Sequence, residues 1–548
     1  MSEPLVAAGS APGATVAGRR VSPIAWLCVI LAVAGAMLTR NLGQPWNGLD
    51  GSNGALFSTI ARNYLHYGPL DLGLGQATNG ETVRDRSELE YYQHHPPLLP
   101  LMVAGTFALF GQGEAQARIG PVVLTLASIV LVFALGRSLY DDAVGVLAAF
   151  FFATFPGVLF FGRMTGYEAP TLFLVLLSTW CYLRFFDAGG WRWCAAFYAS
   201  LLAALWTDWP AFMLAPLLWV HHLIHARKPV LRDPIALWLP LACLGALGAF
   251  IAVAWRVDRT SFDDLVGQGL VYMGLLDPSH PLAHRFVEAK ETFTVVQYLK
   301  RVALRFDLVF AYPTIVLAAA GLWLARVDLD ARRRIVLVLA GTAAAYCVVF
   351  YRSVYIHYWH TYYFAPSFAL LAAVAVRRLS PPSAAGRALE PRAASGPLRG
   401  PIVFVAVALV GAGVLPRLAT LYDIQLRLFP GEQHEQAMLI KNLGAEVRAR
   451  TDAATAVWVV NLAETPGARS ALGWYSARRI LPPAVESARG AASADAGRAA
   501  RLVWLPADGR PVTLADGTTV APAASFTVDG QRFALLDAKG GDAAASGR

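Results

Sequence analysis

The sequence is poor in charge for its length. Of its 548 residues, 15% are charged and 56% are hydrophobic, and the mean hydropathy is +0.47. A soluble enzyme of this size needs more charged residues to cover its surface. The shortage of charge therefore excludes an ordinary soluble enzyme and predicts that a lipid bilayer surrounds much of the chain.

Cysteine is also scarce, and its placement excludes two kinds of site. The five cysteines lie in or at the ends of apolar segments, and no CxxC pair occurs. Neither a disulfide framework nor a cysteine metal site is indicated. The residues are Cys28, Cys181, Cys194, Cys243 and Cys347.

The formal net charge of +9 does not indicate a nucleic-acid partner. The arginines cluster between apolar runs, where basic residues set the orientation of membrane proteins. We expect these connections to face the cytoplasm. They contain Arg137, Arg184 with Arg192, Arg227 with Lys228 and Arg232, Arg326 with Arg332 to Arg334, and Arg377 with Arg378.

Eleven apolar runs approach or reach the length of a transmembrane helix. The first has no convincing signal-peptide cleavage site and is expected to be retained. The runs are Val21–Thr39, Ile119–Leu135, Ala143–Phe161, Ala169–Phe186, Trp191–Trp206, Trp209–Ile224, Ile235–Trp255, Leu308–Ala325, Ile335–Tyr351, Tyr362–Val376 and Pro401–Leu415.

A twelfth run, Pro97–Phe110, is shorter and carries two prolines. If it is embedded without spanning, all the basic connections face the cytoplasm, as the positive-inside rule requires. The sequence therefore predicts an all-α polytopic membrane protein with about eleven spanning helices, one embedded segment, amphipathic loop helices and a small C-terminal α/β extracytoplasmic domain.

This topology divides the chain into four regions. Residues 1–20 form a cytoplasmic tail, and residues 21–417 form the transmembrane domain. That domain includes the first outer loop at 41–96, a large outer loop at 256–307 and a flexible cytoplasmic linker at 377–400. Residues 418–538 are expected to form the outer domain, with a helix at Glu432–Arg450 and strands near Ala456–Val460, Leu502–Leu505 and Phe533–Leu536, before a disordered tail at 539–548.

The first outer loop contains an acidic residue and a histidine pair that could take part in chemistry. Ser52 or Asn53 can cap an amphipathic helix that Gly68-Pro69 ends, and this helix is expected to lie along the membrane surface with Asp50 at its N-terminal approach. Asp50 is a candidate base or ligand, although an Asp-Gly turn explains it equally well. In YYQHHPPLLP, Tyr92, His94 and His95 precede a rigid Pro-Pro turn and are candidates for binding phosphate, or are plain surface residues.

Two further outer connections carry carboxylates at the membrane edge. In FFGRMTGYEAP, Glu168 either pairs with Arg163 or faces a cavity shared with Asp50, since carboxylates beside a bilayer are costly unless solvated or paired. Asp208 in LWTDWP lies at the same depth, in what is also a typical interfacial turn with aromatic anchors.

The late aromatic stretch YRSVYIHYWHTYYFAP falls on the same face. Its aromatic side chains could stack on a sugar, while its basic residues could bond phosphate; an aromatic belt is the alternative. The candidates are Arg352, His357, His360 and Tyr363. Lys290, Lys300, Arg301 and Arg305 of the helical-looking segment His284–Arg305 could attract an anionic lipid head group.

The arrangement resembles the C-type membrane glycosyltransferases, in the branch of protein O-mannosyltransferases and aminoarabinose transferases (glycosyltransferase family 39-like). The resemblance rests on Asp50 before ARNYLHYG, on YYQHHPPLLP, on EAQARIGPVVLTL followed by Gly136-Arg137, on FPGVLFFGRMTGYEAP and on HYWHTYYFAP. It implies a sugar transferred, with inversion, from a polyprenyl-phosphate donor to a lipid, polysaccharide or protein acceptor on the extracytoplasmic side of the inner membrane.

The resemblance implies that Asp50 is the base or positions the acceptor and that Glu168 shapes the site. Two departures matter: many relatives have Asp-Glu where this chain has Asp50-Gly51, and lysines near the positions of His95 and Asp208. The donor phosphate is therefore expected to contact His95, Arg352 or the Arg301 region. Some relatives bind a divalent metal ion, but the sequence shows no compelling ligand set.

Two other classes of function stay open at this level. A transporter or flippase of a glycolipid would usually show broken helices in paired positions or ionisable residues at the bilayer midplane, and neither stands out. A non-catalytic assembly factor is distinguished only by the effect of substituting Asp50 or Glu168.

Overall fold

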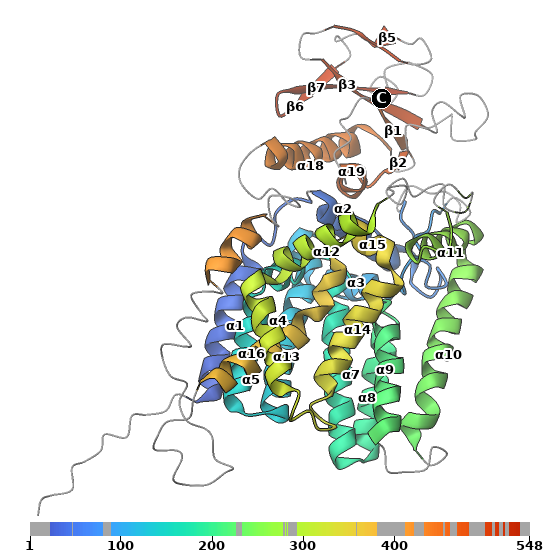
Figure 1. Ribbon diagram of the computed structural model, residues 1–548. Helices are drawn as coiled ribbons and strands as arrows, with labels where there is room; N and C mark the ends of the chain where they lie inside the picture. Colours follow the sequence, from blue (N-terminus) through green and yellow to red (C-terminus); the bar gives the residue numbers. More distant parts are fainter. Residues whose placement is uncertain are drawn as a thin grey trace, which may run out of the picture.

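The structure, a computed structural model, describes residues 22–46, 48–79, 89–225, 233–277, 280, 282, 293–357, 359–380, 411–420, 432–452, 455–460, 468–481, 499–506, 510–514, 519–520 and 525–537. Figure 1 shows a bundle of helices with a smaller sheet-containing part stacked on one end. The predicted tails, most of the 377–400 linker and the first part of the Pro401–Leu415 run lie outside the described residues.

The bundle contains most of the helices. In chain order they are α1 (Pro23–Thr39), α2 (Gly48–Tyr67), α3 (Leu98–Phe110), α4 (Glu114–Leu139), α5 (Asp142–Thr154), α6 (Pro156–Phe161), α7 (Glu168–Ala188), α8 (Trp191–Leu205), α9 (Pro210–His225), α10 (Pro234–Val257), α11 (Arg259–Tyr272), α12 (Val295–Phe310), α13 (Tyr312–Ala325), α14 (Ile335–Val349), α15 (Tyr351–Ile356), the 3₁₀ helix η6 (Trp359–Phe364) and α16 (Ala365–Leu379).

The apolar composition of this bundle fits a polytopic membrane protein. Among the described residues, α4, α7 and α10 are each long and apolar enough to cross a bilayer. The pair α12 and α13, bent by 94°, adds a fourth if it is one span, and α1, α3, α5 and α14 are shorter apolar helices. The number of eleven spans stays a prediction.

Prolines and a positive φ angle interrupt two of the predicted runs. Pro156 ends α5 and starts α6, because the residue before a proline is held in an extended conformation. The run from Leu308 is not one straight helix either: its first residues complete α12, and the chain turns at Ala311, whose φ is +62°, before Pro313 starts α13. The helix predicted at His284–Arg305 is described only from Val295 and extends to Phe310.

The start expected for the first outer-loop helix was wrong. α2 begins at Gly48, so Ser52 and Asn53 lie inside the helix rather than at its cap, while Gly68 ends it with a φ of +85° as predicted. The indole of Trp46 packs so closely on α2 that a Cβ at Gly54 would come within 2.3 Å of it. α3 and the C-terminal helix α19 pack against α2, and its position along a membrane surface stays a prediction.

The C-terminal part is a small α/β domain in the described residues. Its five-stranded sheet has the order β2-β1-β3-β7-β6, in which β1 is parallel to β2 and β3, and β7 is antiparallel to β3 and β6. The predicted helix and strands all have counterparts. The elements are α18 (Glu432–Arg450), β1 (Ala456–Val460), α19 (Ala468–Ser476), β2 (Arg479–Leu481), β3 (Ala499–Leu505), β4 (Val512–Thr513), β5 (Thr519–Val520), β6 (Ser525–Val528) and β7 (Gln531–Asp537).

The helices α18 and α19 lie between the sheet and the bundle, and they fasten the domain to it (Figure 1). Glu114, at the start of α4, accepts hydrogen bonds from Lys441 at 2.8 Å and from the Tyr475 hydroxyl at 2.9 Å. Trp474 of α19 stacks on Phe107 of α3, with ring centres 5.8 Å apart. The domain is therefore held by apolar and charged contacts at the end of the bundle where the outer loops meet.

Candidate functional site

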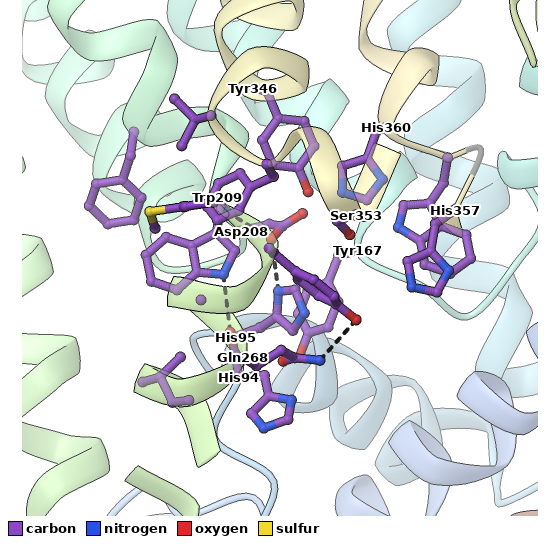
Figure 2. A pocket seen from close by; sticks show the side chains of 18 of the residues that line it. His94, His95, Tyr167, Asp208, Trp209, Gln268, Tyr346, Ser353, His357 and His360 are labelled. Carbon is purple, nitrogen blue, oxygen red and sulfur yellow. Dashed lines mark hydrogen bonds and ion pairs between the residues drawn. The ribbon is translucent and has the colours of Figure 1, made fainter. Parts of the chain in front are cut away.

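A cavity of about 770 Å³ lies where the outer loops meet the helix ends. Its walls come from segments far apart in the sequence: α2, the YYQHHPP turn, the start of α7, the α8–α9 turn, α10, α11, α14, α15 and η6. Figure 2 shows the labelled side chains converging on this space from several elements. We call it the transfer cavity.

One side of the transfer cavity is apolar and the other carries ionisable groups. The apolar side is formed by α9, α10 and α11, through Phe212, Met213, Leu247, Ile251, Leu265, Val266 and Leu270. α10 is the most lipid-accessible of the three long apolar helices, since only 28% of its span is buried inside the protein. The cavity is thus amphipathic, and its apolar side includes α10, the least buried of the three long apolar helices.

A hydrogen-bonded pair, His95 and Asp208, lies on the polar side. The Nδ1 of His95 is 2.8 Å from Asp208 Oδ1 (Figure 2). The Tyr363 hydroxyl donates to Asp208 Oδ2 at 3.3 Å. Because a carboxylate accepts the Nδ1 hydrogen, the neutral imidazole has its hydrogen on Nδ1 and leaves Nε2 as the nitrogen that can bond a ligand.

The two loops that carry this pair are tied together by their backbones. Leu98 N–H donates to the carbonyl of Trp206 at 3.2 Å, and Trp209 Nε1 donates to the carbonyl of His94 at 3.1 Å. The imidazole of His95 also stacks on Tyr167, with ring centres 4.3 Å apart. The Pro-Pro turn fixes the backbone at this point, so the direction of His95 is set by several independent contacts.

Glu168 is the first residue of α7 and lines the same cavity. A Cβ at Gly166 would come within 2.3 Å of its carboxylate, so the small residue leaves room for the Glu168 side chain. Arg163 is not its partner in the described structure. Arg163 is buried and donates to the carbonyl of Asn41 at 3.2 Å, away from the cavity lining.

Three further histidines line the cavity: His94, His357 and His360. Burial lowers the pKa of His94 and of His357 to about 3, and it lowers the pKa of His360 well below its usual value. These imidazoles are therefore neutral near pH 7 when no ligand is present. Arg305 stabilises the backbone that leads to His357, because its guanidinium donates to the carbonyls of Val354 and Tyr355.

The structure brings most of the predicted site residues together, but not all. Tyr92, His94, His95, Glu168, Asp208, His357 and His360 line the transfer cavity. Tyr363 contacts it through Asp208, whereas Arg163 and Arg352 do not line it; Arg352 donates to the Tyr351 hydroxyl at 3.4 Å. Asp50 lies in the first turn of α2, and its side chain lies outside the described part of the structure.

Several lining residues were missed by the sequence interpretation. They include Asn53, Phe57, Tyr167, Trp209, Gln268, Tyr272, Tyr346, Ser353 and Trp359. Asn53 and Tyr167 directly adjoin motifs that were noted, so they could have been found. Gln268 and Tyr272, which are hydrogen-bonded at 3.2 Å, come from α11, a helix that no specific pattern predicted.

A metal site does not form from the described residues. No group of three or more His, Cys, Asp or Glu side chains in the described ranges is arranged to hold an ion. His95 and Asp208 contact each other directly at hydrogen-bond distance. The side chains that the structure describes therefore supply no set of three ligands for a divalent ion.

Comparisons with known proteins agree with the fold. Residues 94–255, which contain His94, His95, Glu168 and Asp208, match the family described as dolichyl-phosphate-mannose-protein mannosyltransferase. No curated protein matches the chain.

Two solved structures share the fold. ArnT from Cupriavidus metallidurans, bound to undecaprenyl phosphate, is 16% identical with a TM-score of 0.57, and the match covers 93% of this chain and 98% of that one. The oligosaccharyltransferase AglB from Archaeoglobus fulgidus, in complex with an inhibitory peptide and a dolichol-phosphate, is 15% identical with a TM-score of 0.52, over 83% of this chain and 64% of that one. This chain thus spans under two thirds of the archaeal protein. The family match over part of the chain and the shared fold make this chain similar to the C-type, family 39-like membrane glycosyltransferases.

Proposed function

We propose that this protein, which has the fold of the C-type membrane glycosyltransferases, transfers a sugar from a polyprenyl-phosphate donor to an acceptor hydroxyl or phosphate at the extracytoplasmic face of the inner membrane. The acceptor class is a lipid, a polysaccharide or a protein. The observation that carries the proposal is the amphipathic transfer cavity, in which Glu168 and the His95–Asp208 pair lie opposite an apolar wall.

The shape of the cavity suits a lipid-linked donor. A polyprenyl chain is apolar and belongs against α9, α10 and α11, whose side chains form the apolar wall. Its phosphate and sugar are polar and belong at the end where the outer loops meet. The aromatic side chains there, including Tyr92, Trp209 and Trp359, offer flat surfaces for a sugar ring.

The proposed reaction is a displacement at the anomeric carbon. The acceptor oxygen attacks from the face opposite the phosphate, a new carbon–oxygen bond forms as the bond to the phosphate oxygen breaks, and the configuration inverts. The acceptor proton passes to a carboxylate, and polyprenyl phosphate leaves with the bonding electrons. In this scheme Glu168 accepts the proton or orients the acceptor.

We assign Asp50 the same role, accepting the proton or orienting the acceptor, because of its position in α2. Position 50 precedes Asn53 by three residues and Phe57 by seven, so all three fall on the same face of the helix. Asn53 and Phe57 line the transfer cavity. This face, together with the resemblance noted from the sequence, supports Asp50 as a second carboxylate of the reaction.

The departing phosphate needs hydrogen-bond donors, and histidines can supply them. Among the described lining residues there is no Lys or Arg, whereas four histidines are present. Asp208 accepts the Nδ1 hydrogen of His95 and directs Nε2 toward a ligand, and in the form with hydrogens on both ring nitrogens Nε2 donates to the phosphate. His95 is therefore proposed to contact the donor phosphate and to stabilise charge on it as the sugar leaves.

The test compares envelope glycolipids, polysaccharides and proteins by mass spectrometry in a deletion strain. The strain carries the wild type, Glu168→Gln, Asp50→Asn or Glu446→Gln, at matched membrane levels. Glu446 is an exposed residue of α18 that pairs with Arg450, so its variant is the matched control. We expect one defined sugar to be lost in the deletion, restored by wild type and Glu446→Gln, and reduced by about 10² to 10⁴-fold in rate by Glu168→Gln.

Two outcomes would contradict the proposal. If no sugar changes in the deletion, the chain is not a transferase of envelope components. If Glu168→Gln and Asp50→Asn both restore the sugar fully, neither carboxylate takes part in the reaction.

A further inference from the structure

A second cavity, of about 290 Å³, lies between the first outer loop and the C-terminal domain. Its walls come from α2, the β-bridge region around Thr78 and Tyr91, and α19 with the start of β2. A cavity accommodates one water molecule in on the order of 10–15 Å³, so this space has room for a phosphate group with water around it. We call it the arginine cavity.

Four arginines and one glutamate line the arginine cavity. The arginines are Arg62, Arg469, Arg478 and Arg479, and the glutamate is Glu90. Thr59, Thr78, Asn79 and Ser470 add polar side chains to the same lining. Four cations that share one small space with a single anion repel one another unless an anion joins them, and guanidinium groups bind phosphate oxygens with strong, directional hydrogen bonds.

The arginines differ in how the protein uses them. Arg478 is buried and donates to the side chain of Thr451 and to four backbone carbonyls, so it fixes the end of α19. Arg62 is also buried; it donates to the Trp474 carbonyl at 3.2 Å and lies over the Trp474 ring. These two supply charge at the floor of the cavity while holding the domain in place.

The remaining two arginines are better placed to hold a ligand. Arg469 is exposed at the rim, and both of its described hydrogen bonds go to the carbonyl of Ile480. Arg479 pairs with Glu90 at 2.7 Å, and the Glu90 side chain is about half exposed. An entering anion could therefore meet Arg469 directly and compete with Glu90 for Arg479.

Tyr92 connects the arginine cavity with the transfer cavity, because it lines both. On the transfer side its ring lies 4.5 Å from the ring of His94. A molecule held in the arginine cavity would thus reach the reacting groups past one aromatic side chain. The polyprenyl donor has its apolar wall on the other side, at α9 to α11.

We propose that the arginine cavity binds a phosphate-class oxyanion carried by the acceptor. The anion anchors the acceptor beside Tyr92, and a hydroxyl or second phosphate of the same molecule extends into the transfer cavity. The assignment to the acceptor rests on the proposed transferase function, whereas the binding of the anion does not.

The experiment uses the purified full-length chain in nanodiscs of neutral phosphatidylcholine, without donor. Inorganic phosphate is titrated at constant ionic strength, and its affinity is measured from the shift in thermal unfolding. The variants are Arg469→Gln, Glu90→Gln and, as matched control, Arg448→Gln, whose side chain is exposed on α18 away from the cavity lining.

The two test variants should shift the affinity in opposite directions. Arg469→Gln should weaken phosphate binding about tenfold, the effect of losing one charge-assisted hydrogen bond. Glu90→Gln should strengthen it severalfold by removing the competing carboxylate, and Arg448→Gln should leave it unchanged. If the cluster is purely structural, the phosphate affinity will not fall in Arg469→Gln and rise in Glu90→Gln. Equal phosphate affinities in the wild type and the three variants would overturn the proposal.

Two further arms identify the source of the anion. In one, glucose 1-phosphate replaces inorganic phosphate; in the other, phosphatidic acid is added to the nanodiscs. Stabilisation by glucose 1-phosphate supports a soluble phosphorylated acceptor, and stabilisation only by phosphatidic acid supports a lipid head group. Phosphate binding is measured here without turnover, and sugar transfer is measured separately in the deletion strain. Phosphate binding with the expected variant effects but no sugar transfer would reject the transferase and keep the anion site. Sugar transfer without phosphate binding would reject the anion site and keep the transferase.

Discussion

The two cavities that meet at Tyr92 handle charge in different ways. The transfer cavity gathers carboxylates and histidines, and its described lining contains no Lys or Arg. The arginine cavity, by contrast, gathers four arginines around one carboxylate. Both lie at the end of the bundle that carries the C-terminal domain, and Tyr92 lines both of them.

This difference indicates a division of labour. Permanent cations bind an anion tightly and keep it, which suits an anchor. Histidines and carboxylates change protonation state at accessible pH, which suits a site where a proton must move and an anionic product must leave. The separation by Tyr92 keeps the anchor from neutralising the groups proposed to carry the reaction.

The largest expected effect concerns the His95–Asp208 pair. Asp208→Asn and His95→Gln should each lower kcat about 100-fold, because the first removes the carboxylate that directs His95 Nε2 to the phosphate and the second removes the imidazole itself. The double variant should be no worse than either single variant, since both act on one unit. Rates of sugar transfer from purified variants check this, and additive losses would show that the two residues act independently.

Removing the wall between the cavities should have a smaller effect. Tyr92→Ala should join the two spaces and raise the acceptor KM about tenfold, because the anchored acceptor is no longer guided past the ring. Tyr92→Phe keeps the aromatic ring and removes only the hydroxyl, so it shows whether the ring or the hydroxyl is responsible for the effect. Acceptor KM and kcat measured for both variants make the distinction, and an unchanged KM in Tyr92→Ala would remove Tyr92 from acceptor guidance.

Loosening the C-terminal domain should affect the arginine cavity alone. Glu114→Gln weakens the hydrogen bonds from Lys441 and Tyr475, at a cost of about 1–3 kcal/mol. The thermal unfolding midpoint should fall, and phosphate affinity should fall severalfold because α19 forms one wall of that cavity. Donor binding, measured in the same protein, should stay close to wild type; an equal loss there would show that the two cavities depend on the domain alike.

The smallest effect is a pH dependence of stability due to His94. The pKa of His94 is about 3 in the folded protein against 6.5 for a free histidine, so the unfolded chain binds more protons between these values. Stability is therefore unaffected by this group above pH 6.5 and falls as the pH drops below it, by at most about 1.4 kcal/mol per pH unit. His94→Asn should lose less stability than wild type between pH 7.5 and 5.5 in thermal unfolding, and identical losses would contradict the shift.

The sequence allowed the elements to be predicted better than their contacts. The apolar run Trp209–Ile224 corresponds to α9, and the predicted helix Glu432–Arg450 has the bounds of α18. Hydrophobic runs and turn residues act locally, so they can be found without a structure. By contrast, the amphipathic pattern of α2 predicts an interfacial helix but holds no information about α19. That helix begins some 400 residues later and packs against α2.

The candidate site shows the same limit. His95, Glu168 and Asp208 were noted separately, each beside a plain structural explanation. Only the fold shows that His95 and Asp208, 113 residues apart in sequence, are hydrogen-bonded and that Arg163 is turned away from Glu168. Arg469 and Arg479 were not singled out, because they lie among the many arginines of the C-terminal half.

The sequence by itself determined that a lipid bilayer surrounds much of this protein, because hydropathy can be read along the chain. The placement of the arginines likewise predicts the side of the membrane on which chemistry is expected. The tertiary structure alone decided which polar groups line a common cavity and which form hydrogen bonds that stabilise the fold. Those outcomes depend on distances of a few ångströms between segments hundreds of residues apart, and a linear pattern carries no information about such distances.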